Sequence, residues 1–181
     1  MDKTLLWHIT MSLDGFIAGP DGEMEWAFAS SGPNPVGEEV MHGTGAILAG
    51  RGWYDVATRR YDGRAGIYGG AWTGPVFVLT HDPPATPDEP GITFLTEDIE
   101  AAVATARAAT GDARHVEVFG AEVARQCLER GLLDEIAVHV APVLLGDGVR
   151  LYGGGAPEVR LERTFLGEAG PQATMRFRVL R

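Results

Sequence analysis

The sequence predicts one α/β domain, built on a mixed and mostly parallel sheet with flanking helices and a C-terminal antiparallel hairpin. Strand-like and helix-like segments alternate from residue 4 to residue 141, and only strand-like segments follow. This order is typical of parallel strands joined by helices that cover the faces of the sheet. With 181 residues, of which 45% are hydrophobic, the chain is long enough for one buried core and short for two. We therefore expect a single domain over residues 1–181.

The first strand is predicted from Leu5 to Met11, where strongly apolar positions alternate with mixed ones. A period of two suits a strand with one buried face. Ser12 to Glu25 contains Asp-Gly, Gly-Pro and a second Asp-Gly pair, all turn formers, so the strand is expected to end in a loop. Loops at strand ends commonly carry ligand-binding residues.

The next segments are predicted from capping and composition. A helix is expected from Val36 to His42, because it follows Asn34-Pro35 and has two glutamates in its early turns. Gly45 to Gly50 indicates a buried strand that leads into a helix over Arg51 to Thr58. Arg60 to Gly74 is rich in glycine and dotted with aromatic residues, which favours a mobile flap over a part of the core.

The second half of the chain continues the alternation. Pro75 to Thr80 is a β-branched and aromatic strand, closed by a His-Asp-Pro-Pro turn. Thr96 is expected to cap the next helix, whose apolar residues recur at near-helical spacing before Gly111. The remaining expected elements are a strand at His115–Val118, a helix at Ala121–Arg130, a strand at Glu135–Val140, and a hairpin of Arg160–Leu166 and Thr174–Leu180.

Composition excludes several classes of function. The net charge of −10 argues against a general nucleic-acid or anionic-membrane surface, because phosphate binding needs clustered basic residues. No apolar run approaches the roughly 18 to 20 residues that span a bilayer. The single Cys127 cannot form an internal disulfide, and no signal-peptide pattern is present, so a cytoplasmic location is expected. Glu38 and His42 stand at helical spacing but have no third ligand, so no metal site is expected.

The segment Phe119-Gly120-Ala121 joins a predicted strand to a predicted helix through one glycine. A helix N-terminus presents unpaired N–H groups and a positive dipole, and glycine lets a diphosphate approach the backbone. The pattern is equally typical of an ordinary strand-to-helix turn. The three glycines of a Rossmann fingerprint are lacking here and at Gly50-Arg51-Gly52.

Two further polar positions could hold a ribose phosphate. Gly50-Arg51 opens a predicted helix, and Thr80-His81 ends a predicted strand. An arginine with polar neighbours and no acidic ribose clamp favours NADPH over NADH. Arg51 could otherwise be a solvated helix-start residue, and His81 an exposed turn residue.

Four segments in order carry a resemblance to a known family: Met11-Ser12-Leu13-Asp14-Gly15-Phe16-Ile17-Ala18, Ile47-Leu48-Ala49-Gly50-Arg51, Val76-Phe77-Val78-Leu79-Thr80, and Ala141-Pro142-Val143-Leu144-Leu145-Gly146-Asp147-Gly148. Together they resemble the reductase domain of riboflavin biosynthesis, the RibD C-terminal domain, within the dihydrofolate-reductase-like fold. The resemblance covers nearly the whole chain. It specifies the fold much more closely than the substrate.

The resemblance implies an NADPH site in this chain. It places the cofactor diphosphate at the turn after the strand, a cofactor phosphate at the Gly-Arg position, and the nicotinamide carboxamide against the loop after the first strand, with one aromatic residue nearby. The cofactor-binding residues implied are Ile17, Ala18, Trp26, Gly50, Arg51, Thr80, His81, Phe119, Gly120, Ala121, Glu122 and Val123.

The catalytic acid is less clearly implied. Folate-reducing relatives carry a proton-donating acid on the helix after the first loop, which points to Glu38 or Glu39 here, although both could simply complement the helix dipole. Asp14 could position a ligand or organise its own loop. The riboflavin-pathway enzymes also have a substrate-binding acidic residue near the end of the strand before the diphosphate turn, where this chain has Val118.

The expected function is NADPH-dependent reduction of a C=N or C=O group in a small heterocyclic or sugar-derived substrate. The nearest resemblance implies reduction of the ribosylamino-pyrimidine intermediate of riboflavin synthesis. The alternatives are pterin or folate reduction, and a nucleotide-binding or drug-binding protein without turnover. A homodimer is also expected, partly through the C-terminal strands, because Val138, Val140, Val143, Leu144 and Leu145 are more apolar than one sheet edge can hide.

Overall fold

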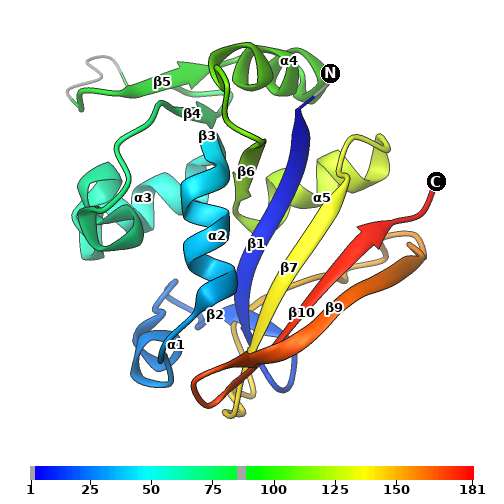
Figure 1. The fold of residues 1–181 in the computed structure, drawn as a ribbon. Helices are drawn as coiled ribbons and strands as arrows, with labels where there is room; N and C mark the ends of the chain where they lie inside the picture. Colours follow the sequence, from blue (N-terminus) through cyan, green and yellow to red (C-terminus); the bar gives the residue numbers. More distant parts are fainter. Residues whose placement is uncertain (1–2, 85–88) are drawn as a thin grey trace.

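A computed structural model describes residues 3–84 and 89–181, and it contains one eight-stranded sheet in the order β5-β4-β3-β6-β1-β7-β10-β9 (Figure 1). The first six strands in this order run parallel, whereas β10 is antiparallel to β7 and β9 is antiparallel to β10. The strands are β1 (Thr4–Ser12), β2 (Phe16–Ala18), β3 (Thr44–Gly50), β4 (Val76–Leu79), β5 (Ile92–Leu95), β6 (His115–Phe119), β7 (Glu135–Ala141), β8 (Val149–Arg150), β9 (Leu161–Ala169) and β10 (Gln172–Val179). The helices are α1 (Glu25–Ala29), α2 (Pro35–Gly43), α3 (Arg51–Arg60), the 3-10 helix η1 (Gly63–Gly70), α4 (Ile99–Ala109) and α5 (Ala121–Glu129). The predicted mixed, mostly parallel α/β fold with a C-terminal hairpin is confirmed.

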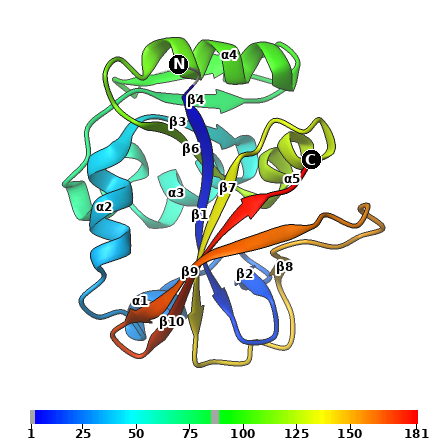
Figure 2. The ribbon, with the colours of Figure 1, turned by 45° about the vertical axis from the view of Figure 1, so that its right-hand side comes forward.

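The side-chain alternation predicted for the first strand divides the core between the two faces of the sheet. Leu5 and Trp7 of β1 pack into the main core beneath α4 and α5, while Leu6 packs against Val36 and Val40 of α2 on the other face. Figure 2 shows α2 and α5 on opposite sides of β1. Strand β1 therefore has one face toward each layer of helices.

Two helices, α2 and α4, begin at a residue whose side chain caps the first turn. Asn34 caps α2, because its side chain accepts a hydrogen bond from the Gly37 N–H. The prediction that Thr96 caps α4 is wrong. Asp98 is the capping residue, and its carboxylate accepts a hydrogen bond from the Ala101 N–H.

The prediction of a mobile flap at residues 60–74 is also wrong. Ile67 and Trp72 are buried, and the Trp72 indole donates a hydrogen bond of 2.9 Å to the Thr44 carbonyl. Tyr68 lies between them with a φ of +51°, a left-handed conformation that is uncommon outside glycine. The glycines made this segment look mobile, but its aromatic side chains attach it to the sheet.

Four short elements were not predicted: β2, α1, β5 and β8. Strands β2 and β8 pair with each other, far from one another in the sequence, and β5 forms the edge of the main sheet beside β4. Each has five residues or fewer, so its sequence carries too little periodicity to be recognised alone.

The apolar surface of the C-terminal half lies elsewhere than predicted. Val138 is 3% exposed within the sheet, and of the predicted apolar set only Leu144 is strongly exposed, at 70%. Instead, Leu161, Phe165 and Leu166 are exposed on β9, the edge strand of the sheet (Figure 2). The exposed apolar side chains of this sheet edge therefore lie on β9.

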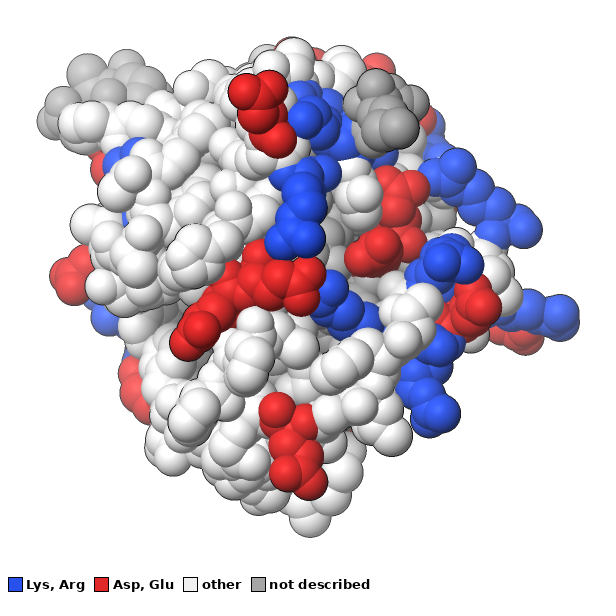
Figure 3. All heavy atoms as spheres, viewed as in Figure 1, with Lys and Arg blue, Asp and Glu red and all other residues white. Residues whose placement is uncertain are grey.

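In the described ranges, no helix is both long and apolar enough to cross a membrane. Figure 3 shows acidic and basic residues intermingled on one face of the molecule, with no broad basic patch there. Cys127 is buried in the main core, and burial raises the pKa of its thiol to about 12.

Candidate functional site

A cavity of about 1250 Å³ lies at the carboxyl ends of β3 and β6. The two strands are neighbours, with Ala49 opposite Phe119, and each leads directly into a helix. Helix α3 begins after Gly50 and α5 begins after Gly120. Both N-termini line the same cavity, so their free N–H groups and positive dipole ends meet there.

Gly120 shapes this turn through its backbone conformation. Its φ is +98°, which L side chains rarely adopt. A Cβ atom built there would lie 3.8 Å from both the Gly50 nitrogen and the Trp53 Cβ, which is ordinary contact. Glycine is therefore required by conformation rather than by lack of space within the protein, and the two helix starts lie within van der Waals reach.

Arg51 is held at the rim of the cavity by two interactions. Its Nε donates to Asp55 at 2.7 Å, and its Nη1 donates to the Asp82 carbonyl at 2.5 Å. The hydrogen bond to Asp55 raises the pKa of the Arg51 guanidinium. Thr80 is buried beside it, with its hydroxyl accepting from the Asp82 N–H at 3.2 Å, whereas His81 is exposed.

The first turn of α5 carries an acidic residue at the place where an anion would bind. Glu122 lines the cavity, and its carboxylate accepts a hydrogen bond of 2.6 Å from Arg125, which lowers the pKa of Glu122. Arg125 also pairs with Glu129 at 2.5 Å, so it offsets the negative charge of Glu122 only in part. The other basic residues that line the cavity are Arg51, Arg59, Arg130 and Arg150.

The loop after β1 closes another side of the cavity. Ile17 and Ala18 of β2 line it, and β2 pairs with β8, whose Arg150 guanidinium lies 4.6 Å from the centre of the Phe16 ring. Of the twelve residues predicted to bind cofactor, ten line this one cavity: Ile17, Ala18, Gly50, Arg51, Thr80, His81, Gly120, Ala121, Glu122 and Val123.

The other two predicted cofactor residues lie outside the cavity lining. Trp26 is on α1, where its indole donates to the Glu23 carbonyl at 3.1 Å. Phe119 is the last residue of β6, and its ring packs against Trp53 at a centroid distance of 5.3 Å.

Asp14 organises its loop. Its carboxylate accepts hydrogen bonds from the Ser12 hydroxyl at 2.6 Å and from the N–H groups of Leu145 and Gly146 at 3.1 and 2.7 Å. The bond from Ser12 is the main cause that lowers the pKa of Asp14 to about 2. Asp14 is therefore ionised at neutral pH and ties the loop after β1 to the segment after β7.

The two glutamates predicted as proton donors point away from the cavity. Glu38 and Glu39 are exposed on α2. The Glu39 carboxylate forms ion pairs with Arg114 at 3.3 Å and Arg176 at 3.2 Å. Neither residue is among those that line the cavity.

Comparison with known proteins identifies the family. Residues 3–174 match the RibD C-terminal domain. The chain belongs to this family. It is 27% identical over 156 residues, 84% of each chain, to the uncharacterized protein YwjB of Bacillus subtilis.

Three solved structures share the fold. A candidate riboflavin biosynthesis protein from Shewanella sp. PV-4 superposes with a TM-score of 0.80 at 22% identity, covering 98% of this chain and 99% of that one. The riboflavin biosynthesis reductase of Saccharomyces cerevisiae gives 0.61 at 17% identity, covering 99% and 90%. Dihydrofolate reductase from Enterococcus faecalis, in complex with NADP(H), gives 0.62 at 14% identity, covering 98% and 97%. The fold of this RibD C-terminal domain is therefore dihydrofolate-reductase-like.

The structure also locates an acidic residue that sequence reasoning missed. Val118 packs into the core beneath α4 and α5, whereas Glu117 lies on the opposite face of β6, completely buried. Around Glu117 lie His8, Tyr68 and His139, from three other elements. A charged residue inside an otherwise apolar strand was the available signal, but its partners are too distant in sequence to be predicted.

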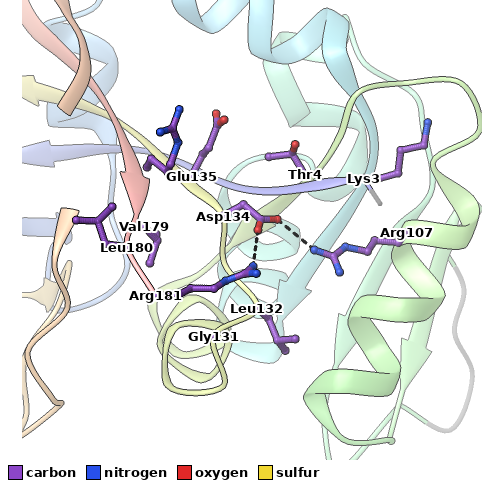
Figure 4. A pocket seen from close by; sticks show the side chains of 11 residues that line it. Lys3, Thr4, Arg107, Gly131, Leu132, Asp134, Glu135, Val179, Leu180 and Arg181 are labelled. Carbon is purple, nitrogen blue, oxygen red and sulfur yellow. Dashed lines mark hydrogen bonds and ion pairs between the residues drawn. The ribbon is translucent and has the colours of Figure 1, made fainter. Parts of the chain in front are cut away.

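A second cavity, of about 710 Å³, lies at the amino end of β1 and contains no predicted site residue. Figure 4 shows Arg107 and Arg181 converging on Asp134, with N–O distances of 3.1 and 2.8 Å. Both guanidinium groups therefore already have an acidic partner. Among the described residues of this RibD C-terminal domain, no three His, Cys, Asp or Glu side chains are grouped so that they could hold a metal ion.

Proposed function

We propose that this protein is an NADPH-dependent reductase that transfers a hydride to a C=N or C=O group of a small heterocyclic or sugar-derived substrate. The specific activity proposed is reduction of 5-amino-6-(5-phosphoribosylamino)uracil, from membership of the RibD C-terminal family. The observation that carries the proposal is the meeting of two helix N-termini, at Gly50 and Gly120, in one large cavity.

The residues of the cavity fit such a cofactor. Backbone N–H groups at the starts of α3 and α5 suit a diphosphate, and residues of both helix starts line the cavity, with Gly120 at a positive φ between β6 and α5. Arg51 beside Thr80 suits the additional phosphate of NADPH, because guanidinium binds phosphate with charge-assisted hydrogen bonds. When bound, the cofactor supplies the hydride, and the protein orients it and excludes water.

We further propose that the protein forms a homodimer through β9. This edge strand exposes Leu161, Phe165 and Leu166, and every one of its residues from Leu161 to Leu166 is exposed. An unpaired edge with apolar side chains favours pairing with a second chain, and twofold association is the commonest form.

The experiment that tests the reductase proposal compares two glycines that both have a positive φ angle. Gly120→Ala places a methyl group at the proposed diphosphate turn, whereas Gly155→Ala introduces one at φ +82° in a position with no atom within 4 Å. Both variants carry backbone strain, and Gly155 does not line the cavity. We expect only Gly120→Ala to weaken NADPH binding, by at least about tenfold, measured by calorimetry on protein shown to be folded.

Turnover separates an enzyme from a binding protein. Oxidation of NADPH is followed at 340 nm with 5-amino-6-(5-phosphoribosylamino)uracil and, in parallel, with dihydrofolate. Turnover of the second compound alone would replace the proposed substrate with a pterin. Tight NADPH binding without turnover of either would favour a binding protein, and equal NADPH affinity in both glycine variants would remove the diphosphate site.

A further inference from the structure

Five arginines line the large cavity, and they differ in whether a carboxylate neutralises them. Three form ion pairs with carboxylates of the same cavity, at N–O distances of 2.5 to 2.7 Å: Arg51 with Asp55, Arg125 with Glu122, and Arg130 with Glu100. The other two, Arg59 and Arg150, form no ion pair within residues 3–84 and 89–181. A guanidinium beside a carboxylate adds little net charge, so the unneutralised positive charge of the cavity comes from Arg59 and Arg150.

Strand β8 fixes the backbone of Arg150 at the edge of the cavity. Arg150 pairs with Phe16 of β2, and the next N–H group, that of Leu151, donates to the Gly15 carbonyl at 2.9 Å. A Cβ atom built at Gly153 would lie 3.6 Å from Arg150 Cδ, and Gly153 lines the cavity as well. The stem of the Arg150 side chain therefore runs beside the cavity wall.

The ring of Phe16 holds the Arg150 guanidinium by its face. Phe16 is 4% exposed, so its ring is fixed by packing, and Arg150 Cζ lies over it at 4.6 Å from the ring centre. This cation–π contact leaves the N–H groups at the edge of the guanidinium plane for other partners. None of these N–H groups has a hydrogen-bond partner in the part of the chain that the structure describes. Arg150 is therefore oriented by the protein while its donors stay available to a ligand.

Arg59 adds a second positive charge beside the same segment of the chain. It lies in the last turn of α3, where its Nη2 donates to the Asp21 carbonyl at 3.3 Å. Asp21 and Phe16 both belong to residues 16–22, and five residues of this segment line the cavity. Arg51 lies eight residues earlier in α3, about 12 Å along the helix axis. The cavity therefore has a second cationic region, apart from the place proposed for the additional phosphate of NADPH.

A phosphate group matches the donors of Arg150. Guanidinium binds phosphate with charge-assisted hydrogen bonds from its in-plane N–H groups, which are the groups that Phe16 leaves uncovered. Both ligands of the proposed reaction carry phosphate, the cofactor as a diphosphate and the substrate as a monoester. An arginine that is paired with a carboxylate must give up part of that contact to bind phosphate, whereas Arg150 has no such contact to lose.

We propose that Arg150, assisted by the charge of Arg59, binds a phosphate group of a ligand in this cavity. This inference rests on the proposed reductase function, and it adds two binding residues to those predicted from the sequence. The phosphate belongs either to the cofactor or to the substrate, and two experiments separate these sources.

The first experiment requires no turnover. The full chain is labelled with ¹⁵N-arginine, and the side-chain Nε–H signal of Arg150 is assigned by its absence in Arg150→Lys. Pyrophosphate stands for the diphosphate of the cofactor, ribose 5-phosphate for the phosphate of the substrate, and ribose is the uncharged control. We expect at least one of the two phosphates to shift the Arg150 signal, and ribose to leave it in place. No shift with either phosphate up to about 10 mM would overturn the site.

The second experiment measures binding and turnover in Arg150→Ala, with Arg160→Ala as the matched control outside the cavity. If the phosphate is that of the cofactor, the Kd values of NADPH and NADH should both rise by about tenfold or more, because both carry the diphosphate. If it is that of the substrate, KM for 5-amino-6-(5-phosphoribosylamino)uracil should rise by about tenfold or more, with kcat and NADPH affinity unchanged. Arg59→Ala should act in the same direction with a smaller effect.

Folded Arg150→Ala that keeps the wild-type Kd for both cofactors and the wild-type KM would show that Arg150 binds no phosphate. The failure of the proposed function has a different signature. If the wild type binds no NADPH, the reductase proposal fails, and the NMR titration still decides whether phosphate binds at Arg150.

Discussion

The two faces of the sheet near β1 differ in how their polar groups are assembled. The cavity at the carboxyl ends is lined by several short runs of sequence, among them residues 50–53 and 120–123 at the two glycines. The cluster around Glu117 is assembled from β1, η1, β6 and β7, with sequence separations of 49 to 131 residues. The cavity suits an anion that binds and leaves, whereas the cluster holds its groups in fixed positions.

The largest expected difference between the two regions is in stability. Glu117→Ala removes the hydrogen-bond partner of three side chains and should lower the free energy of unfolding by about 3–5 kcal/mol, because a buried pair is broken. Glu122→Ala, which removes an exposed acid of the cavity, should cost less than about 1 kcal/mol. Urea unfolding monitored by circular dichroism measures both. Similar losses in the two variants would contradict the distinction.

The next prediction concerns cofactor choice in the cavity. Arg51→Ala should weaken NADPH binding by roughly 10- to 100-fold and leave NADH binding nearly unchanged, because only NADPH carries the additional phosphate. Arg160→Ala is the control, since Arg160 pairs with Glu158 outside the cavity. Calorimetry that finds equal losses for the two cofactors would remove Arg51 from the phosphate site.

Acid should weaken the cluster before it affects the loop tether at Asp14. The pKa of His139 falls from its ordinary 6.5 to about 3 in the folded protein, so the unfolded chain binds more protons between these values. This contribution to stability is complete above pH 6.5 and is lost, at up to about 1.4 kcal/mol per pH unit, as the pH falls toward 3. His115 acts in the same direction, because burial lowers its pKa as well.

Unfolding curves between pH 6.5 and 4.5 test whether His139 causes this loss of stability in acid. His139→Gln should show a shallower loss of stability than the wild type, while His42→Gln, changed at an exposed site, should follow the wild type. Parallel curves for wild type and His139→Gln would show that His139 is not buried in its neutral form.

The smallest effect on stability is expected for a substitution at the edge of the sheet. Leu166 is 59% exposed, so Leu166→Asp should leave the melting temperature nearly unchanged and shift the molecular mass toward the monomer in sedimentation experiments. Thr58→Asp, on the exposed side of α3, is the control. A monomeric wild type at micromolar concentration would rule out the proposed dimer.

Most of the fold and ten of the residues that line the cavity could be predicted from the sequence, because both depend on local sequence signals. Alternation in Leu5 to Met11 and the glycine before Ala121 are local signals, and each corresponds to an element of the structure. The cluster around Glu117 could not be predicted, because Tyr68 reaches it from a glycine-rich segment that looked mobile. Glu38 and Glu39 were selected by their helix alone, although the spacing of Val36 and Val40 marks another face of α2 as the buried one.

The hydrogen bonds of Asp14 have a practical consequence for exchanging loops between relatives. They connect residues separated by 131 and 132 positions, so the loop after β1 and the segment after β7 form one mechanical unit. A chimera whose imported loop lacks an acid at position 14 would leave two N–H groups without this acceptor, and an imported segment after β7 with another backbone path would leave the Asp14 carboxylate without these donors. Substrate preference should therefore transfer between proteins of this fold only when residues 12–18 and 143–148 are grafted together.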